Sequence, residues 1–92
     1  MTQRLTLKIF GLVQGVGFRY LSQKKAKSRG FTGYVKNLDD GAVELVAEGE
    51  ATALKEFIAW CYNGVGPAQV TKIEENWSEA TGEFSDFRVT RV

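Results

Sequence analysis

A glycine-rich run that ends in an arginine is the first feature of this sequence that could do chemistry. Residues 11–19 read GLVQGVGFR, with three glycines before Arg19. Glycines permit backbone conformations in which successive N–H groups converge on an anion, and an arginine guanidinium can hold two phosphate oxygens at once. The run lacks the Gly-Lys-Ser/Thr of a nucleotide P-loop and does not match GxGxxG. It therefore predicts a phosphate-sized anion site that neither nucleotide motif describes.

The chain contains no histidine, which argues against several common kinds of active site. Histidine is the usual base for a serine or cysteine nucleophile and the commonest zinc ligand. Cys61, the only cysteine, lies at the end of an apolar helical stripe and is interpreted as a core or boundary residue. Asp39 and Asp40 in NLDDG are interpreted as turn formers rather than a catalytic pair. We expect no metal site and no cofactor.

The elements that must position Arg19 follow from the periodicity of the apolar residues. Alternating side chains predict strands, spacings of three and four predict helices, and residues 11–17 predict a loop. The predicted strands are residues 4–10, 31–37, 42–48, 69–77 and 84–91, and the predicted helices are residues 18–29 and 51–62. The side chains predicted to face the core from the strands are Leu5, Leu7 and Ile9, and Val43, Leu45 and Ala47. Those predicted to face it from helix 18–29 are Phe18, Leu21 or Ser22, and Lys25 or Ala26. Those predicted to face it from helix 51–62 are Leu54, Phe57, Ile58, Cys61 and Tyr62.

The order of these elements is strand, helix, strand, strand, helix, strand, with a short extra strand at the end. Two amphipathic helices and a mainly antiparallel sheet bury their apolar faces best when both helices cover one side of the sheet. The sequence therefore predicts an α+β fold, a ferredoxin-like βαββαβ sandwich, as a single domain over residues 1–92. Gly30 stands where a helix C-terminal glycine belongs.

Two segments of the chain resemble the signature motifs of the acylphosphatase family. They are VQGVGFR at residues 13–19 and GYVKNLDDGAVE at residues 33–44. GPAQV at 66–70 and FSDFRV at 84–89 also look like the C-terminal half of that family, so the resemblance extends over nearly the whole chain. Lys36 stands where the family often has arginine, a small departure that leaves the catalytic assignment intact. The resemblance implies hydrolysis of a small-molecule acyl phosphate.

The resemblance also implies roles for individual residues. Arg19 binds phosphate with its side chain, and Asn37 positions the nucleophilic water. The phosphate-binding residues are Gln14, Gly15, Val16, Gly17, Phe18 and Arg19. Inorganic phosphate or another oxyanion is expected at the same loop. A carboxylate leaving group needs no proton from a general acid, so positioning and charge stabilisation suffice, which agrees with a chain that lacks histidine.

The charges of the chain are divided unevenly along its length. Residues 1–38 hold eight cations and no acid, whereas residues 39–92 hold all eleven acids and four cations. This asymmetry predicts a positive field on the first half if its cations cluster in space. For the lysines between residues 24 and 27, a solvated helix face is the simpler interpretation.

The whole-chain properties predict a soluble, cytoplasmic monomer. The 92 residues are 43% apolar, without a run long enough to span a membrane and without a secretion signal. The predicted topology is shared by RNA-recognition domains, but residues 42–48 carry no aromatic residue on which a base could stack, so no nucleic-acid partner is expected. A second alternative is an acylphosphatase-like fold that serves as a phosphate- or carbamoyl-phosphate-sensing domain, which binding of an acyl phosphate without turnover would support.

Overall fold

A computed structural model describes residues 1–90 of the chain. Five strands and two helices account for most of these residues. The elements are β1 (Thr2–Leu12), α1 (Phe18–Ser28), β2 (Thr32–Asn37), β3 (Val43–Glu50), α2 (Ala51–Asn63), β4 (Gln69–Glu79) and β5 (Phe87–Thr90). Neither helix is long and apolar enough to cross a membrane.

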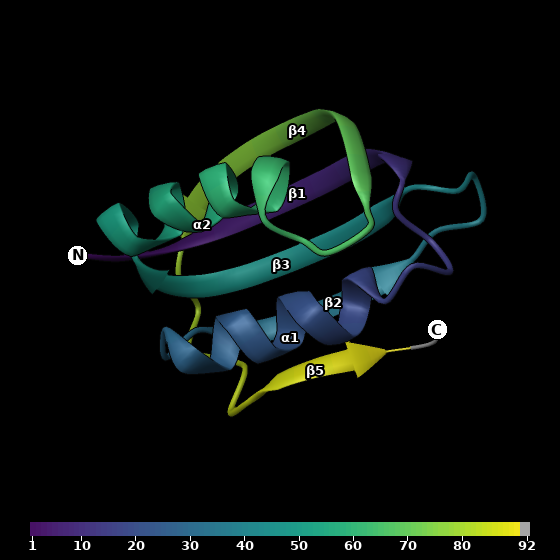
Figure 1. Cartoon of the computed structure of the whole chain (residues 1–92). Coiled ribbons are helices and arrows are strands. Elements are labelled where there is room, and N and C mark those ends of the chain that lie inside the picture. Colours follow the sequence, from purple (N-terminus) through teal and green to yellow (C-terminus); the bar gives the residue numbers. More distant parts are fainter. Residues whose placement is uncertain (91–92) are drawn as a thin grey trace.

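The strands form one mixed sheet in the order β4-β1-β3-β2-β5. The pairs β1–β3, β1–β4 and β2–β3 are antiparallel, and β2–β5 is parallel. Both helices cover the same face of the sheet, with α1 against β2 and β5 and α2 against β1, β3 and β4 (Figure 1). The predicted βαββαβ sandwich with an extra C-terminal strand is confirmed.

The core lies between this face and the helices, where the alternation in the sequence placed it. The side chains predicted to face inward from β1 and β3 are all 0% exposed: Leu5, Leu7, Ile9, Val43, Leu45 and Ala47. The α2 stripe is also buried at Leu54, Phe57, Ile58 and Cys61. Tyr62 was predicted with that stripe but is 44% exposed, at the end of the helix, where its hydroxyl accepts from the Ile73 N–H.

Helix α1 has a thin apolar stripe, for which the sequence left two alternatives, Leu21 or Ser22 and Lys25 or Ala26. Phe18, Ser22 and Ala26 are the buried residues, and the Ser22 hydroxyl donates to the Arg19 carbonyl. The helix ends at Ser28 with Arg29 as its C-cap, and Gly30 follows with φ 77°, in the place predicted for a C-terminal glycine. The Gly30 N–H donates to Lys27 and the next N–H donates to Ala26, so two C-terminal carbonyls are satisfied.

The boundaries of the first and last strands differ from the prediction. Gly11 was predicted in the loop but lies in β1, at a bulge where a Cβ atom would come within 2.1 Å of the Gln69 carbonyl oxygen. Glycine is needed here for close approach of β4 rather than for a turn. Strand β5 begins at Phe87 rather than Phe84, because residues 80–86 form the connection between β4 and β5. Arg91, the predicted end of the last strand, lies outside the described residues.

The segment between β4 and β5 crosses the sheet on the face away from the helices, because these strands occupy opposite edges (Figure 1). Glu48 on β3 fastens this crossing and is only 4% exposed. Its carboxylate accepts from Arg4 Nε at 2.8 Å, the Thr81 N–H at 2.9 Å and the Gly82 N–H at 3.0 Å. Burial raises the pKa of Glu48, but the Thr81 amide, Arg4 and the Gly82 amide outweigh it and lower the pKa to about 2.

Candidate functional site

The loop between β1 and α1 has backbone geometry suited to an anion. Gly15 has φ 76° and Gly17 has φ 81°, both left-handed, while Val16 and the helical residues around them have no positive φ. Left-handed glycines that alternate with residues of ordinary hand are typical of a nest, a concave turn in which successive N–H groups can converge on an anion. Gly17 is the N-cap of α1, yet no side chain caps the helix and its first turn contains no acid. Within the described residues the N–H groups of this turn therefore have no acceptor, as is usual at a helix N-terminus.

A cavity of about 300 Å³ opens beside this loop. Its lining residues are Val13, Gly15, Gly17, Phe18, Arg19, Tyr20 and Val89. Within residues 1–90, the Arg19 guanidinium makes no ion pair or hydrogen bond, so its charge is available to a ligand. The N-terminus of α1 and an arginine that no described residue pairs with thus share one cavity.

Most of the other cations in the first half of the chain are neutralised. Ion pairs join five of them to acids of the second half: Arg4–Glu48, Lys8–Asp40, Lys27–Asp86, Arg29–Glu56 and Lys36–Glu44. The broad positive field expected from the linear sequence is therefore largely offset in space. Among residues 1–90, Arg19, Lys24 and Lys25 are the cations of this half that form no ion pair, and of these three Arg19 lines the cavity.

Gln14 connects the loop to the turn between β2 and β3. Its Nε2 donates to the Leu38 and Ala42 carbonyl oxygens, each at 2.8 Å. The same turn is closed by the Leu38 N–H, which donates to the Ala42 oxygen, also at 2.8 Å. The Gln14 side chain therefore holds the start of the loop against the residue that follows Asn37. Its side chain does not line the cavity.

Asn37 ends β2 on the sheet face that the helices cover. It pairs with Val43, which pairs in turn with Ile9 near the end of β1. Strand alternation places its side chain on the same face as Val35, and Val35 pairs with the cavity residue Val89. Asn37 Oδ1 is buried and has no hydrogen-bond partner in the described part of the chain. Such a group costs about 1–3 kcal/mol and calls for an explanation.

The structure brings together only part of the predicted site. Gly15, Gly17, Phe18 and Arg19 line the cavity, whereas Gln14, Val16 and Asn37 are not among its lining residues. Val16 packs instead against the edge of the core.

Sequence reasoning missed three residues that line this cavity: Val13, Tyr20 and Val89. The signal for Tyr20 was its position directly after Arg19. Val89 gave no signal, because only the parallel pairing of β5 with β2 brings it to the loop.

Cys61 and Asp40 have the structural roles that the sequence analysis predicted. Cys61 is 1% exposed, and burial raises the pKa of its thiol to about 12, so it has neither the access nor the thiolate of a nucleophile. Asp40 Oδ1 accepts from the Ala42 N–H at 3.0 Å, as a turn former does. Among residues 1–90, no group of three or more His, Cys, Asp or Glu side chains is placed to hold a metal ion.

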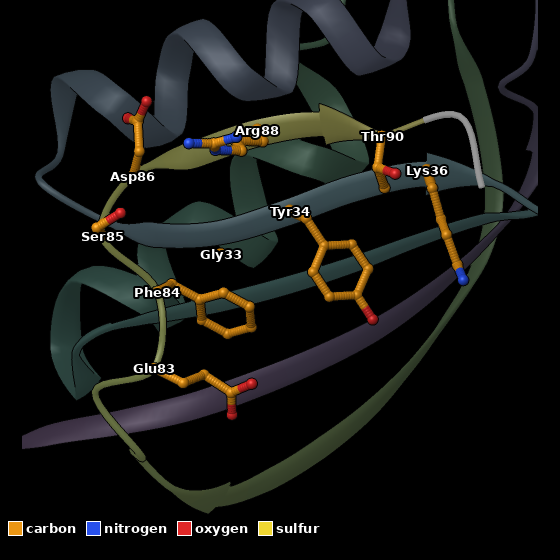
Figure 2. Close-up of a pocket in the computed structure, with 9 residues that line it drawn as sticks. All are labelled: Gly33, Tyr34, Lys36, Glu83, Phe84, Ser85, Asp86, Arg88 and Thr90. Atoms are coloured by element: carbon orange, nitrogen blue, oxygen red, sulfur yellow. The ribbon is translucent and has the colours of Figure 1, made fainter.

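A second hollow, of about 460 Å³, lies on the open face of the sheet between β2, β5 and the crossing segment (Figure 2). The rings of Tyr34 and Phe84 meet edge to face there, with centroids 5.9 Å apart. Its carboxylates and its lysine are engaged with partners, since Glu83 pairs with Arg4, Asp86 with Lys27 and Lys36 with Glu44. None of the predicted site residues lines this hollow.

Comparison with known proteins identifies the family. The acylphosphatase family model matches residues 5–89. The chain belongs to the acylphosphatase family. An acylphosphatase from Caldanaerobacter subterraneus subsp. tengcongensis is 47% identical over 89 residues, covering 97% of this chain and 99% of the relative. An acylphosphatase from Paenarthrobacter aurescens is 47% identical over 88 residues, covering 96% of this chain and 94% of the relative.

A solved structure agrees with this membership of a hydrolase family. The crystal structure of the Bacillus subtilis acylphosphatase superposes with a TM-score of 0.91 at 39% identity, covering 98% of this chain and 99% of that chain. The family resemblance read from residues 13–19 and 33–44 is thus confirmed. Of the two aromatic residues in the predicted strand 31–37, Phe31 is 3% exposed in the core and packs against Phe57, whereas Tyr34 lies on the open face (Figure 2).

Proposed function

We propose that this acylphosphatase-family protein hydrolyses acyl phosphates at the cavity beside residues 14–19. In this proposal the loop amides and Arg19 bind the phosphoryl group, and Asn37 orients the attacking water. The observation that carries it is the uncapped N-terminus of α1, which opens on the same cavity as an arginine that has no ion pair or side-chain hydrogen bond among residues 1–90. Backbone N–H groups and the helix dipole favour an anion there, and the guanidinium adds a charged fork for two of its oxygens.

The unpaired Oδ1 of Asn37 supports the second role. A buried acceptor without a partner is destabilising, and a retained cost of this kind is often tied to function. The side-chain amide of Asn37 carries both an acceptor oxygen and a donor nitrogen, so it can accept from and donate to a water. Gln14 would keep this amide in a constant position relative to the loop by its bonds to Leu38 and Ala42.

The proposed reaction requires no acid or base from the protein. The water oxygen forms a bond to phosphorus while the bond from phosphorus to the acyl oxygen breaks, and its electron pair leaves with the carboxylate. A phosphate oxygen takes the proton of the water. Because the carboxylate is a weak base, stabilising charge on the phosphoryl oxygens and fixing the water in line would account for catalysis. The products are a carboxylate and inorganic phosphate.

The decisive experiment measures phosphate release from benzoyl phosphate in the presence of a chelator. Arg19→Ala is expected to reduce kcat/KM by about 10³- to 10⁵-fold, as for other arginines that stabilise a phosphoryl transition state. Asn37→Ala is expected to cost about 10²-fold or more, the scale of losing one fixed hydrogen-bonding group. Arg88→Ala and Asn76→Ala are matched controls, because both residues are exposed and lie outside the cavity.

The outcomes separate the enzyme from a binding module. Chelator-resistant turnover that is lost in both site variants and kept in both controls would support the proposal. A folded wild-type chain that binds inorganic phosphate but releases none from benzoyl phosphate would support the binding module instead. Activity that disappears with chelator would contradict the metal-free reaction, and near-normal activity in Arg19→Ala would remove that residue from the mechanism.

A further inference from the structure

The cavity beside the loop has two chemically different sides. Gly15, Gly17 and Arg19 form the side suited to a phosphoryl group, whereas the remaining lining residues are apolar or aromatic: Val13, Phe18, Tyr20 and Val89. An acyl phosphate has the same division, because its charge is concentrated on the phosphoryl group and the acyl group can be wholly apolar. The apolar side therefore faces the part of the substrate that the phosphate loop does not recognise.

The apolar residues that line the cavity differ in how much surface they offer to a ligand. Val13 and Phe18 are each 1% exposed and form the floor, while Tyr20 is 64% exposed at the mouth. No hydrogen bond or ring contact engages the Tyr20 side chain within the described residues. By contrast Tyr62, the other strongly exposed tyrosine, uses its hydroxyl to accept from the Ile73 N–H. Tyr20 is thus a large aromatic ring that is free to pack on a ligand.

Tyr20 is also fixed relative to the phosphate site. It follows Arg19 in the first turn of α1, so the two side chains leave the helix about 100° apart and only about 1.5 Å apart along its axis. A phosphoryl group held by the loop and Arg19 would leave its acyl group within reach of the tyrosine ring. Aromatic rings gain from packing on each other beyond the burial of their area, so an aromatic acyl group would benefit most.

We propose that Tyr20 determines acyl-group specificity and makes this protein prefer acyl phosphates with an aromatic or bulky apolar acyl group. This inference rests on the proposed function, since it assigns the other half of the same cavity. The phosphate loop recognises only the phosphoryl group, so selectivity for the acyl group would come from this apolar half of the cavity.

The test compares an aromatic substrate with a small one. The kcat/KM values for benzoyl phosphate and acetyl phosphate are measured for the wild type, Tyr20→Ala and Tyr20→Phe. The benzoyl-to-acetyl ratio is expected to fall about five- to tenfold in Tyr20→Ala, the scale of one lost aromatic contact. Tyr20→Phe keeps the ring and is expected to keep the ratio. Leu12→Ala is the matched control, because Leu12 is 53% exposed next to the loop but does not line the cavity.

A binding measurement tests Tyr20 independently of turnover. Calorimetry gives the affinities for phenylphosphonate and methylphosphonate, which cannot be hydrolysed, in the same four proteins. Tyr20→Ala is expected to lose affinity for phenylphosphonate selectively, by a similar five- to tenfold factor. Equal losses on both phosphonates, or an unchanged benzoyl-to-acetyl ratio, would overturn the role of Tyr20. Absence of hydrolysis in the wild type would instead defeat the proposed function, while the phosphonate ratio would still decide the role of Tyr20.

Discussion

Replacing Glu48 with glutamine is expected to destabilise the fold by about 2–4 kcal/mol, although the residue lies outside the cavity. Glu48 is the buried group that fastens the crossing segment to the sheet, through Arg4, Thr81 and Gly82. That segment delivers β5, whose Val89 forms part of the cavity wall. The substitution keeps the shape of the side chain and removes only its charge and one of its two acceptor oxygens.

The magnitude follows from which oxygen each donor uses. Oε2 accepts from Arg4 and Thr81, and Oε1 accepts from Gly82. A glutamine amide can turn its single oxygen toward Arg4 and Thr81, which leaves the Gly82 N–H facing an NH₂ group. An unpaired buried donor costs about 1–3 kcal/mol, and the remaining bonds lose their charge assistance, worth about 1 kcal/mol more.

The same interaction predicts the pH at which the difference disappears. The folded-state pKa of Glu48 is about 2, below the ordinary value of 4.5, so its contribution is present in full above pH 4.5 and is lost as the pH falls toward 2. By linkage, this contribution is at most about 3 kcal/mol. Other carboxylates with lowered pKa values titrate in both proteins, so the difference between wild type and Glu48→Gln isolates this residue.

Chemical denaturation of the two proteins between pH 7 and pH 2 measures both predictions, and thermal unfolding at pH 7 should show a decrease in Tm of about 10–25 °C. Glu83→Gln is the control, because Glu83 contacts the same Arg4 but is 56% exposed, and an exposed pair contributes at most about 1 kcal/mol. A Glu48→Gln protein within 0.5 kcal/mol of wild type would refute the reasoning. So would a difference that is the same at pH 7 and at pH 3.

Two further predictions concern the loop and the core. Gln14→Leu removes two hydrogen bonds of 2.8 Å, so the loop remains but loses its fixed position relative to Asn37. This variant is expected to lower kcat on benzoyl phosphate about tenfold or more, with a smaller change in the inhibition constant of inorganic phosphate. Equal changes in both constants would contradict this positioning role. Native Cys61 is expected to resist iodoacetamide at pH 8, because it is 1% exposed and the pKa of its thiol is raised to about 12, whereas the unfolded chain should react readily. Mass spectrometry measures this, and rapid stoichiometric labelling of the folded chain would disprove the assignment.

The sequence predicted the layers of the fold well because strand alternation and helical spacing are local properties. The inward faces of β1 and β3 follow directly from Leu5, Leu7 and Ile9 and their counterparts. Glu48 could not be predicted in this way. It occupies a position on the outward face of β3, and only the later crossing of residues 80–86 buries it.

The candidate site shows the same division between local and non-local information. Gly15, Gly17 and Arg19 were recognisable because a nest and a helix N-terminus are built from consecutive residues. The contact of Gln14 with Leu38 and Ala42 joins two loops that lie far apart in sequence, and no local pattern indicates it. The roles of Arg19 and Asn37 in catalysis stay predictions.

The parallel pairing of β2 with β5 has a consequence for how the protein folds. Gly33 pairs with Phe87, so this ladder closes a loop that contains β3, α2 and β4. The entropy of closing so long a loop is lost before the pairing stabilises the chain, and folds dominated by such contacts form more slowly than helical bundles of similar size. We therefore expect β5 to join a sheet that is already assembled. Because β5 carries Val89, the wall of the cavity would be completed in the last step of folding, after the phosphate loop has formed.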